Sequence, residues 1–305
     1  MLRSFFIGLS QSKSLRAMAE SSSLGKKLSR RFVPGMEVED VLRAAKEVNE
    51  LGMSVSIDNL GENVTNAEEA SRSAALYHQL LDEIAARHLN ANVSLKLTHM
   101  GLDVDEKLAT HTTRGLVQHA ARSNNFVRVD MEGSAYTQRT LDLVKAMHGE
   151  EGNAGRVGAV IQAYLHRSRR DVEELIGQRI RIRLCKGAYQ EPPEIAFQKK
   201  SEVDGNFVGL MKILLSSGVY HGIATHDPAM VQATRDFARQ ERIRPDSFEF
   251  QMLYGIRRDL QQSLVKDGWR MRVYIPFGTE WYPYFMRRLA ERPANAVFVL
   301  KNLFR

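Results

Sequence analysis

The sequence predicts an α/β fold, a distorted (βα)8 barrel of the TIM type preceded by an N-terminal helical segment. From residue 53 onward, short runs of β-branched and apolar residues recur eight times, with amphipathic helical patterns between them. Strict alternation indicates a parallel sheet, and eight units indicate a sheet that closes on itself. A doubly wound open sheet is the alternative, but no G-x-G-x-x-G follows the first predicted strand.

The elements follow one another along the chain. Residues 1–50 form the helical segment, in which 38–51 has the clearest helical spacing, and residues 51–305 form the barrel. The predicted strands are 53–58, 93–99, 126–132, 158–164, 181–187, 220–226, 248–253 and 271–278. The helical patterns between them include 67–87, 135–148, 194–216 and 230–240.

A polar side chain lies at or near the carboxyl end of every predicted strand. In a barrel of this type we expect the strand bodies to fill an apolar interior and the chemistry to lie at their carboxyl ends. Any one of these side chains could serve a structural hydrogen bond or ion pair. A full ring of buried charges is too costly to be structural alone, so together they predict a binding site. The ring consists of Asp58, Glu62, Lys96, Asp130, Gln162, Arg183, Lys186, Thr225, His226, Gln251 and Tyr274.

The last helix carries a second signal. Tyr284, Arg287, Arg288 and Glu291 are spaced i, i+3, i+4 and i+7, which places them on one helical face. Pro283 suits the first turn of that helix. A solvated, salt-bridged face is the alternative. Because the helix follows the eighth strand, its first turns should lie over the barrel mouth, where two guanidiniums can bind a small carboxylate.

The charge is unevenly distributed. The 305 residues carry 43 Lys and Arg against 36 Asp and Glu, a net charge of +7. Residues 1–31 and 255–305 each hold +6, so the middle of the chain is acidic. The N-terminal part is compatible with a capping helix, a helix on an anionic membrane surface, or a presequence.

Several function classes are disfavoured. The single cysteine, Cys185, excludes an intramolecular disulfide and a Cys/His zinc spacing, and indicates a reducing compartment. His221 and His226 are poorly placed to share a metal, and we expect no metal site. Basic and aromatic residues do not interleave on a single element, which argues against a nucleic-acid partner.

The strand-end residues occur in segments that resemble the proline dehydrogenase family, in particular its single-function bacterial members, which are FAD-dependent enzymes with a distorted (βα)8 barrel. The resemblance runs from about residue 54 to the C-terminus. The segments are Leu60-Gly61-Glu62, Ser94-Leu95-Lys96-Leu97, Val129-Asp130, Gln162-Ala163-Tyr164, Arg183-Leu184-Cys185-Lys186-Gly187-Ala188-Tyr189, Ala224-Thr225-His226, Glu249-Phe250-Gln251-x-Leu253 and Tyr284-x-x-Arg287-Arg288-x-x-Glu291.

The resemblance implies a role for each matched residue. Arg183, Asp130 and Tyr274 would be catalytic, with Arg183 near the flavin N5. Glu62 would pair with Arg287 as a gate over the substrate. The implied substrate-binding residues are Lys96, Arg287, Arg288, Tyr284, Leu253, Ala188, Tyr189 and Glu62. The implied FAD-binding residues are Gln162, Arg183, Lys186, Gly187, Ala188, Thr225, His226, Asp130, Met131 and Glu291.

The resemblance also implies a reaction. L-Proline would be oxidised to Δ1-pyrroline-5-carboxylate, the first step of proline catabolism to glutamate, and the electrons would pass to a membrane quinone. A separate Δ1-pyrroline-5-carboxylate dehydrogenase would perform the next step. Relatives that act on hydroxyproline are expected to carry a small residue in place of Tyr274, so its presence favours proline. We expect a cytoplasmic protein with peripheral contact at the inner face of the cell membrane.

Other readings remain open at this stage. A Schiff-base aldolase barrel with Lys96 as nucleophile, or another flavin barrel such as a folate reductase, would use the same strand ends. A protein that binds nucleic acid or a membrane surface through its basic ends belongs to a different class. Flavin absorbance that bleaches with L-proline distinguishes these readings.

Overall fold

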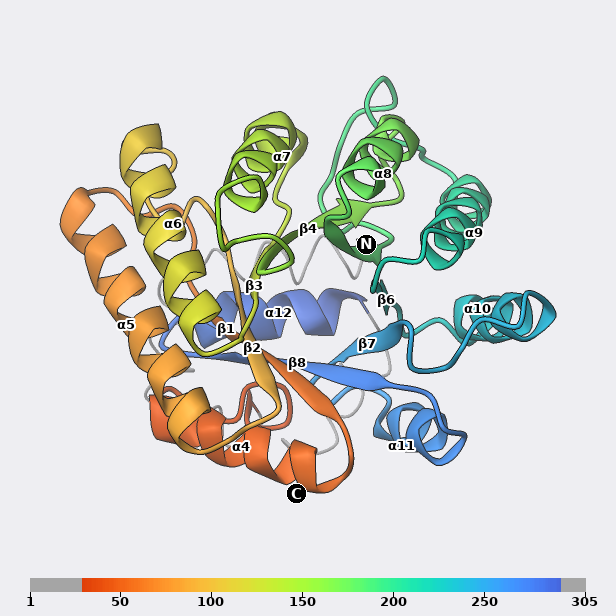
Figure 1. The fold of residues 1–305 in the computed structure, drawn as a ribbon, viewed down its shortest axis with the longest axis horizontal. Helices are drawn as coiled ribbons and strands as arrows, with labels where there is room; N and C mark the ends of the chain where they lie inside the picture. Colours follow the sequence, from red (N-terminus) through yellow and green to blue (C-terminus); the bar gives the residue numbers. More distant parts are fainter. Residues whose placement is uncertain (1–28, 292–305) are drawn as a thin grey trace.

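Eight parallel strands form a closed barrel, and a helix follows each strand (Figure 1). The computed structural model describes residues 29–291, apart from the side chains of Arg287, Leu289, Ala290 and Glu291 in the last helix. The strands pair in chain order, and the eighth pairs with the first. The (βα)8 fold predicted from the sequence is confirmed.

All eight predicted strands are present. Several end earlier than predicted, so that Lys96, Asp130 and Thr225 come directly after a strand instead of within it. The strands are β1 Ser54–Asn59, β2 Ala91–Leu95, β3 Val127–Val129, β4 Val157–Gln162, β5 Arg181–Cys185, β6 Gly222–Ala224, β7 Glu249–Leu253 and β8 Met271–Phe277.

The helices alternate with the strands. Side-chain caps fix where some of them begin: the Asn66 side chain accepts a hydrogen bond from the Glu69 N–H, and Asp227 does the same for Ala229. The helices are α4 Val38–Glu50, α5 Ala67–Ala86, α6 Glu106–Arg122, α7 Ser134–His148, α8 Ser168–Gly177, α9 Lys200–Ser216, α10 Pro228–Gln240, α11 Arg258–Lys266 and α12 Trp281–Glu291.

One predicted helix begins too early. The helical pattern at 194–216 starts as a helix only at Lys200. The residues before it form a loop that contains Pro192 and Pro193, and Ala196 forms an antiparallel bridge with Leu165. Because proline lacks an N–H and this bridge holds the backbone extended, the amphipathic spacing is overridden there.

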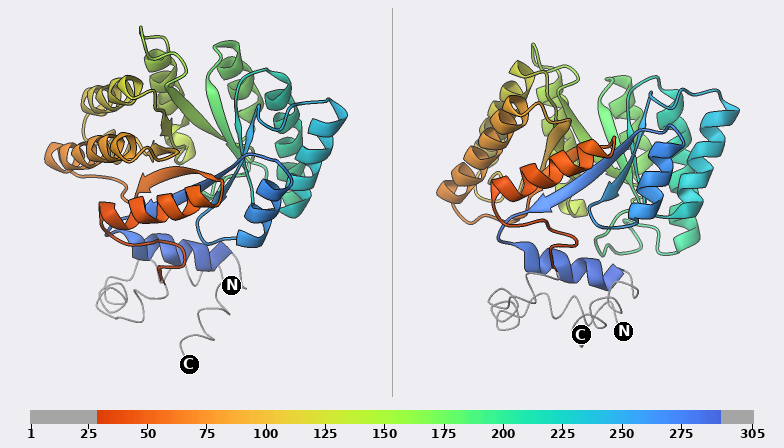
Figure 2. Two further views of the ribbon diagram at one scale, coloured as in Figure 1. Left: turned by 60° about the horizontal axis from the view of Figure 1, so that its bottom comes forward. Right: turned by 90° about the horizontal axis from the view of Figure 1, so that it is seen from below.

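Two helices depart from the positions expected in a regular barrel. α4 packs against β1 and β8, where the helix after β8 would ordinarily lie. α12 instead lies across the barrel, outside the ring of the other helices (Figures 1 and 2). The division at residue 50 stays a prediction, and the alternatives for residues 1–28 fall outside the described residues. Within those described, no helix is long and apolar enough to cross a bilayer.

The barrel interior is polar, so the expected apolar interior is wrong. Strand residues alternate between the two faces of the sheet, and here the apolar set points outward beneath the helices. Buried outward residues include Val55, Ile57, Val93, Leu95, Ile182, Leu184, Phe250 and Val273. Buried or half-buried polar residues that reach one another across the interior include Ser56, Ser94, Arg183, Glu249, Gln251 and Arg272.

The packing of α4 can be tested at Leu42, which is 1% exposed in the core shared by sheet and helices. We expect Leu42→Ala to lower the free energy of unfolding by about 2–5 kcal/mol, because it removes buried methyl groups and leaves a cavity. Lys46→Ala, on the exposed side of the same helix, should change it by less than about 0.5 kcal/mol. Urea denaturation measures both, and equal losses would show that α4 is not part of the core.

Candidate active site

The predicted site residues lie at the carboxyl ends of the strands, on the side that α12 covers. α12 follows β8 after a short turn, and Figure 2 shows it extending across one end of the barrel. α12 therefore lies over the carboxyl ends of the strands, as predicted for the last helix. The residues in this region form a charged centre, a second charged group and a set of polar strand ends.

Arg183 is the centre of the region, and its side chain on β5 is buried. Its Nη1 donates to Asp130 Oδ1 at 2.6 Å, and its Nε donates to Gln251 Oε1 at 2.5 Å. The Asp130 carboxylate also accepts hydrogen bonds from the Ser94 hydroxyl at 2.7 Å and the Tyr274 hydroxyl at 2.9 Å. Side chains from β2, β5, β7, β8 and the end of β3 thus meet at one ion pair.

Lys96 is the second charged group. Its Nζ lies 3.4 Å from Asp58 Oδ2 and 4.0 Å from Glu62 Oε1. Burial raises the pKa of Asp58 to about 6; the Asp130 charge adds to this and Lys96 opposes it. Burial lowers the pKa of Lys96, but the charges of Asp58, Glu62 and Asp130 outweigh it and raise that pKa above its ordinary value. Lys96 is therefore an ammonium at neutral pH.

α12 contributes an apolar face and a guanidinium. Tyr284 is buried in an apolar cluster into which Leu253, at the end of β7, also packs. Leu253 pairs with Tyr274 of β8, which connects this cluster to the Arg183 centre. The Arg288 guanidinium lies 5.1 Å from the centre of the Tyr284 ring. α12 thus packs against the end of β7 through the cluster that contains Tyr284, and the substrate-binding roles of Tyr284 and Arg288 stay predictions.

Arg287 and Glu291 complete the predicted face of α12. The side chains of Arg287 and Glu291 lie outside the described residues. The predicted gate between Glu62 and Arg287 therefore stays a prediction, and the carboxylate of Glu62 is described near Lys96.

Lys186 and Thr225 follow β5 and β6. The Lys186 ammonium lies between two carboxylates, with hydrogen bonds to Asp227 at 2.7 Å and to Asp204. The Thr225 hydroxyl accepts from the Asp227 N–H at 3.1 Å. In this structure the predicted cofactor-binding lysine is thus held by acidic neighbours that fix its position at the strand end.

Gln162 and His226 bind the backbone of neighbouring strand ends. Gln162 Nε2 donates to the Glu132 carbonyl at 2.9 Å, and His226 Nε2 accepts from the Leu253 N–H at 2.9 Å. The neutral form of His226 provides that acceptor nitrogen. Both residues therefore fix the spacing between strand ends around the site.

Gly187 directs the chain out of β5. Its φ is +112°, and a Cβ there would lie 2.2 Å from a ring carbon of Tyr164, so no larger residue fits. Ala188 and Tyr189 follow it and are exposed, with Tyr189 at 39%. Met131, by contrast, is buried. The loop after β5 thus presents Tyr189 to solvent beside the strand ends.

Three contributors were missed by sequence reasoning. Tyr77 of α5 donates to the Ser94 carbonyl at 2.8 Å, and its hydroxyl lies 3.4 Å from Asp58 Oδ1. No strand pattern marks a residue that reaches the site from a helix. Glu249 and Arg272 form an ion pair of 2.6 Å beneath Gln251. Each alternates with apolar residues along its strand, β7 or β8, and this pattern could have predicted that both point into the barrel interior.

The geometry permits specific chemistry. Lys96, protonated and partly exposed, can bind an anion, and a buried Arg183 can stabilise negative charge in a place that water barely reaches. Tyr274 places an aromatic ring beside that guanidinium, 5.1 Å from ring centre to Cζ. Such a set suits the binding and orientation of a small anion better than the activation of a nucleophile.

Comparison with known proteins agrees with this geometry. The chain is similar to proline dehydrogenase 1 of Bacillus subtilis strain 168, with 41% identity over the full length of both chains. It is 37% identical to proline dehydrogenase of Deinococcus radiodurans, over 91% of this chain and 90% of that protein. Both relatives therefore match across nearly all of the region described above.

A solved structure and a family model extend this likeness. Proline utilization A of Bdellovibrio bacteriovorus superimposes with a TM-score of 0.83 at 26% identity and covers 88% of this chain. This chain spans 33% of that longer one. The model of the family described as "Proline dehydrogenase" matches residues 41–301. The barrel, its Arg183-centred carboxyl end and these matches together show that the chain belongs to the proline dehydrogenase family.

Proposed function

We propose that the protein oxidises L-proline to Δ1-pyrroline-5-carboxylate, with FAD as cofactor and a quinone as final electron acceptor. The proline ring would lose a hydride from carbon 5 and a proton from nitrogen, which leaves a C=N bond. The observation that carries the proposal is the buried Arg183–Asp130–Tyr274 network at the carboxyl end of a barrel that matches this family.

Lys96, Arg288 and Arg287 would bind the substrate carboxylate. The raised pKa of Lys96 keeps it cationic, and its neighbours Asp58 and Glu62 hold it in place. A carboxylate bound by several fixed cations has one orientation, so the ring carbon that reacts is placed reproducibly. This restriction of orientation is what these residues would contribute to the rate.

Tyr274, Tyr284 and Leu253 would surround the pyrrolidine ring. Tyr274 is fixed by its hydrogen bond to Asp130, and Leu253 packs both beside Tyr274 and against the cluster that contains Tyr284. Apolar walls held this way exclude water from the reacting carbon. Ala188 and Tyr189 would complete the wall from the loop after β5.

The residues present fit FAD. A flavin and its phosphates require cations and hydrogen-bond donors, and β4, β5 and β6 end in an amide, a guanidinium, an ammonium and a hydroxyl. When bound, FAD supplies the electron acceptor for hydride transfer. The residues proposed to hold it are Gln162, Arg183, Lys186, Gly187, Ala188, Thr225, His226, Asp130, Met131 and Glu291.

A quinone acceptor would bring the protein to a membrane. We therefore infer a cytoplasmic location with peripheral contact at the inner face of the cell membrane, and a separate Δ1-pyrroline-5-carboxylate dehydrogenase as the enzyme that consumes the product. The excess of basic residues in 1–31 supports contact with an anionic lipid surface.

The raised pKa of Lys96 disfavours the aldolase alternative. A Schiff-base lysine reacts as the neutral amine, which is promoted by a lowered pKa. Here the neighbouring carboxylates raise the pKa of Lys96 above its ordinary value, so the amine is scarce at neutral pH. Carboxylate binding is the use that this environment favours.

The proposal predicts a flavin that responds to proline. We expect the purified protein to be yellow, or to become yellow with added FAD, and its flavin absorbance to bleach anaerobically on addition of L-proline. D-Proline is the matched control, because its carboxylate and reacting carbon cannot both occupy the same positions. A colourless protein that takes up no FAD would rule the proposal out.

Arg288→Ala should raise the KM for proline by about 10- to 100-fold, because a charge-assisted contact to the carboxylate is lost. FAD absorbance should remain. Arg239→Ala, an equal charge change on the exposed end of α10, should leave KM unchanged.

Glu62→Ala completes this series. If Glu62 acts as a gate, its removal should raise KM less than Arg288→Ala does, because no direct contact with the carboxylate is lost. Steady-state kinetics of the variants decide this, and an equal or larger effect of Glu62→Ala would assign Glu62 a structural role.

Tyr274 should set the preference for proline over hydroxyproline. Tyr274→Ser opens space for the extra hydroxyl, so we expect the ratio of kcat/KM for hydroxyproline to that for proline to rise by about 10-fold or more. Tyr274→Phe keeps the ring and removes the hydroxyl that donates to Asp130, so it should lower activity on both substrates without changing the ratio. An unchanged ratio in Tyr274→Ser would contradict this role.

A further inference from the structure

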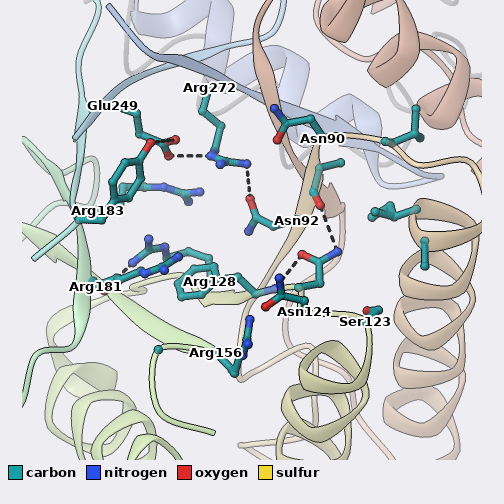
Figure 3. Close-up of a pocket in the computed structure, with 18 of the residues that line it drawn as sticks. Asn90, Asn92, Ser123, Asn124, Arg128, Arg156, Arg181, Arg183, Glu249 and Arg272 are labelled. Atoms are coloured by element: carbon teal, nitrogen blue, oxygen red, sulfur yellow. Dashed lines mark hydrogen bonds and ion pairs between the residues drawn. The ribbon is translucent and has the colours of Figure 1, made fainter. Parts of the chain in front are cut away.

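A cavity of about 720 Å³ lies at the amino ends of the strands, opposite the ends that α12 covers. Figure 3 shows the side chains that line it. It is lined by the starts of β2, β5, β7 and β8, by the segments before β3, β4 and β6, and by the ends of α5 and α6. Of the residues that line it, the proposed reaction assigns a role to Arg183 alone. Its polar lining includes Asn90, Asn92, Asn124, Asn125, Arg128, Arg156, Arg181, Tyr220, Glu249 and Arg272.

The charge of this lining is strongly unbalanced. Arg272 forms an ion pair of 2.6 Å with Glu249, which neutralises one guanidinium. Across residues 29–291, no described carboxylate lies within ion-pairing distance of Arg128, Arg156 or Arg181. An adjoining pocket shares Arg181 and Arg272 and adds Arg270. The cavity thus holds several guanidiniums that the described chain does not neutralise.

Arg128 is built into the wall of the cavity. It is 5% exposed, and its Nη1 donates to the carbonyls of Ala159 at 2.9 Å and Arg181 at 2.7 Å. Its guanidinium lies 4.7 Å from the centre of the Phe126 ring. Gly158 leaves room for it, because a Cβ there would lie 2.8 Å from Arg128 Nη1. These contacts fix the guanidinium without supplying a negative charge.

The guanidiniums are close enough to affect one another. Burial lowers the pKa of Arg128 well below its ordinary value. The charges of Arg183 and Arg181 lower it further, although the carboxylates of Glu249 and Asp130 oppose this. Burial also lowers the pKa of Arg181, and Arg156 and Arg272 add to this, although Tyr220 and Glu249 oppose it. Like charges held together at a partly buried site favour a bound anion, which would relieve their repulsion.

We propose that this cavity is a second binding site, for a small anion that carries several carboxylate or phosphate groups. Planar guanidiniums bind both groups by paired hydrogen bonds, and the asparagine amides of the lining add neutral donors. Its volume suits a small molecule. The site is separate from the substrate carboxylate site, which lies at the opposite ends of the strands.

A hydrogen-bonded chain connects this cavity to the Arg183 centre. Arg272 donates to Glu249 at 2.6 Å, Gln251 donates to the same carboxylate at 2.6 Å, and Arg183 donates to Gln251 at 2.5 Å. Arg183 itself contributes to the lining of the cavity. The two ends of the barrel interior are therefore separated by one continuous layer of polar side chains.

The test uses the flavin-loaded, full-length protein and three probes: citrate, pyrophosphate and inorganic phosphate, titrated calorimetrically at constant ionic strength. We expect saturable binding of one molecule of citrate or pyrophosphate per chain, and the probe that binds more tightly distinguishes a carboxylate from a phosphate ligand. Arg181→Gln and Arg156→Gln should each weaken this binding by about 10-fold or more. Arg239→Gln, with the same charge change on the exposed end of α10, should not.

Controls keep the result separate from the proposed reaction. The flavin absorbance of Arg156→Gln and Arg181→Gln should equal that of the unmodified protein, which shows that both variants are folded. Absence of saturable binding with every probe would overturn the proposal. So would binding that Arg288→Ala abolishes and that both cavity variants retain, because the anion would then occupy the substrate site.

Discussion

The Arg183 guanidinium lies in the middle of the barrel, 7% exposed, where an uncompensated charge would cost several kcal/mol. Asp130 provides the opposite charge, and Gln251, Ser94 and Ser56 provide acceptors. Each lies on or directly after a different strand, so the charge is stable only if the sheet closes in this register. The same closure places Tyr274 against Asp130 and so shapes the proposed substrate site.

The fold could be predicted because the sequence pattern of each strand and helix is confined to a short segment of the chain. Each strand is a short apolar run between helical patterns, and alternation of the two indicates a closed parallel sheet. The strand-end polar residues were also predictable, since any parallel barrel gathers them at one mouth. Their partners are known only from the structure, in which Arg183 pairs with Asp130 and the Thr98 hydroxyl donates to Glu132.

Other features of the structure are contacts between residues that lie far apart in the sequence, and no local sequence pattern predicts such contacts. Tyr77 reaches the site from α5, and the position of α4 beside β8 is a long-range contact. The polar interior is a different case, because residues such as Arg181 and Arg183, or Glu249 and Gln251, alternate visibly with apolar ones. The expectation of an apolar barrel interior outweighed this alternation, and the cavity at the amino ends was missed with it.

The two faces of each strand have different roles. The outward, apolar face packs against the helices, and the inward, polar face lines the barrel interior. On β5, Ile182 and Leu184 pack under the helices, while Arg181 and Arg183 point inward. A substitution of a charged side chain in the interior thus need not disturb the apolar packing between the strands and the helices. A lineage could alter what either mouth binds, one alternate residue at a time, while the surrounding layer of helices stays as it is.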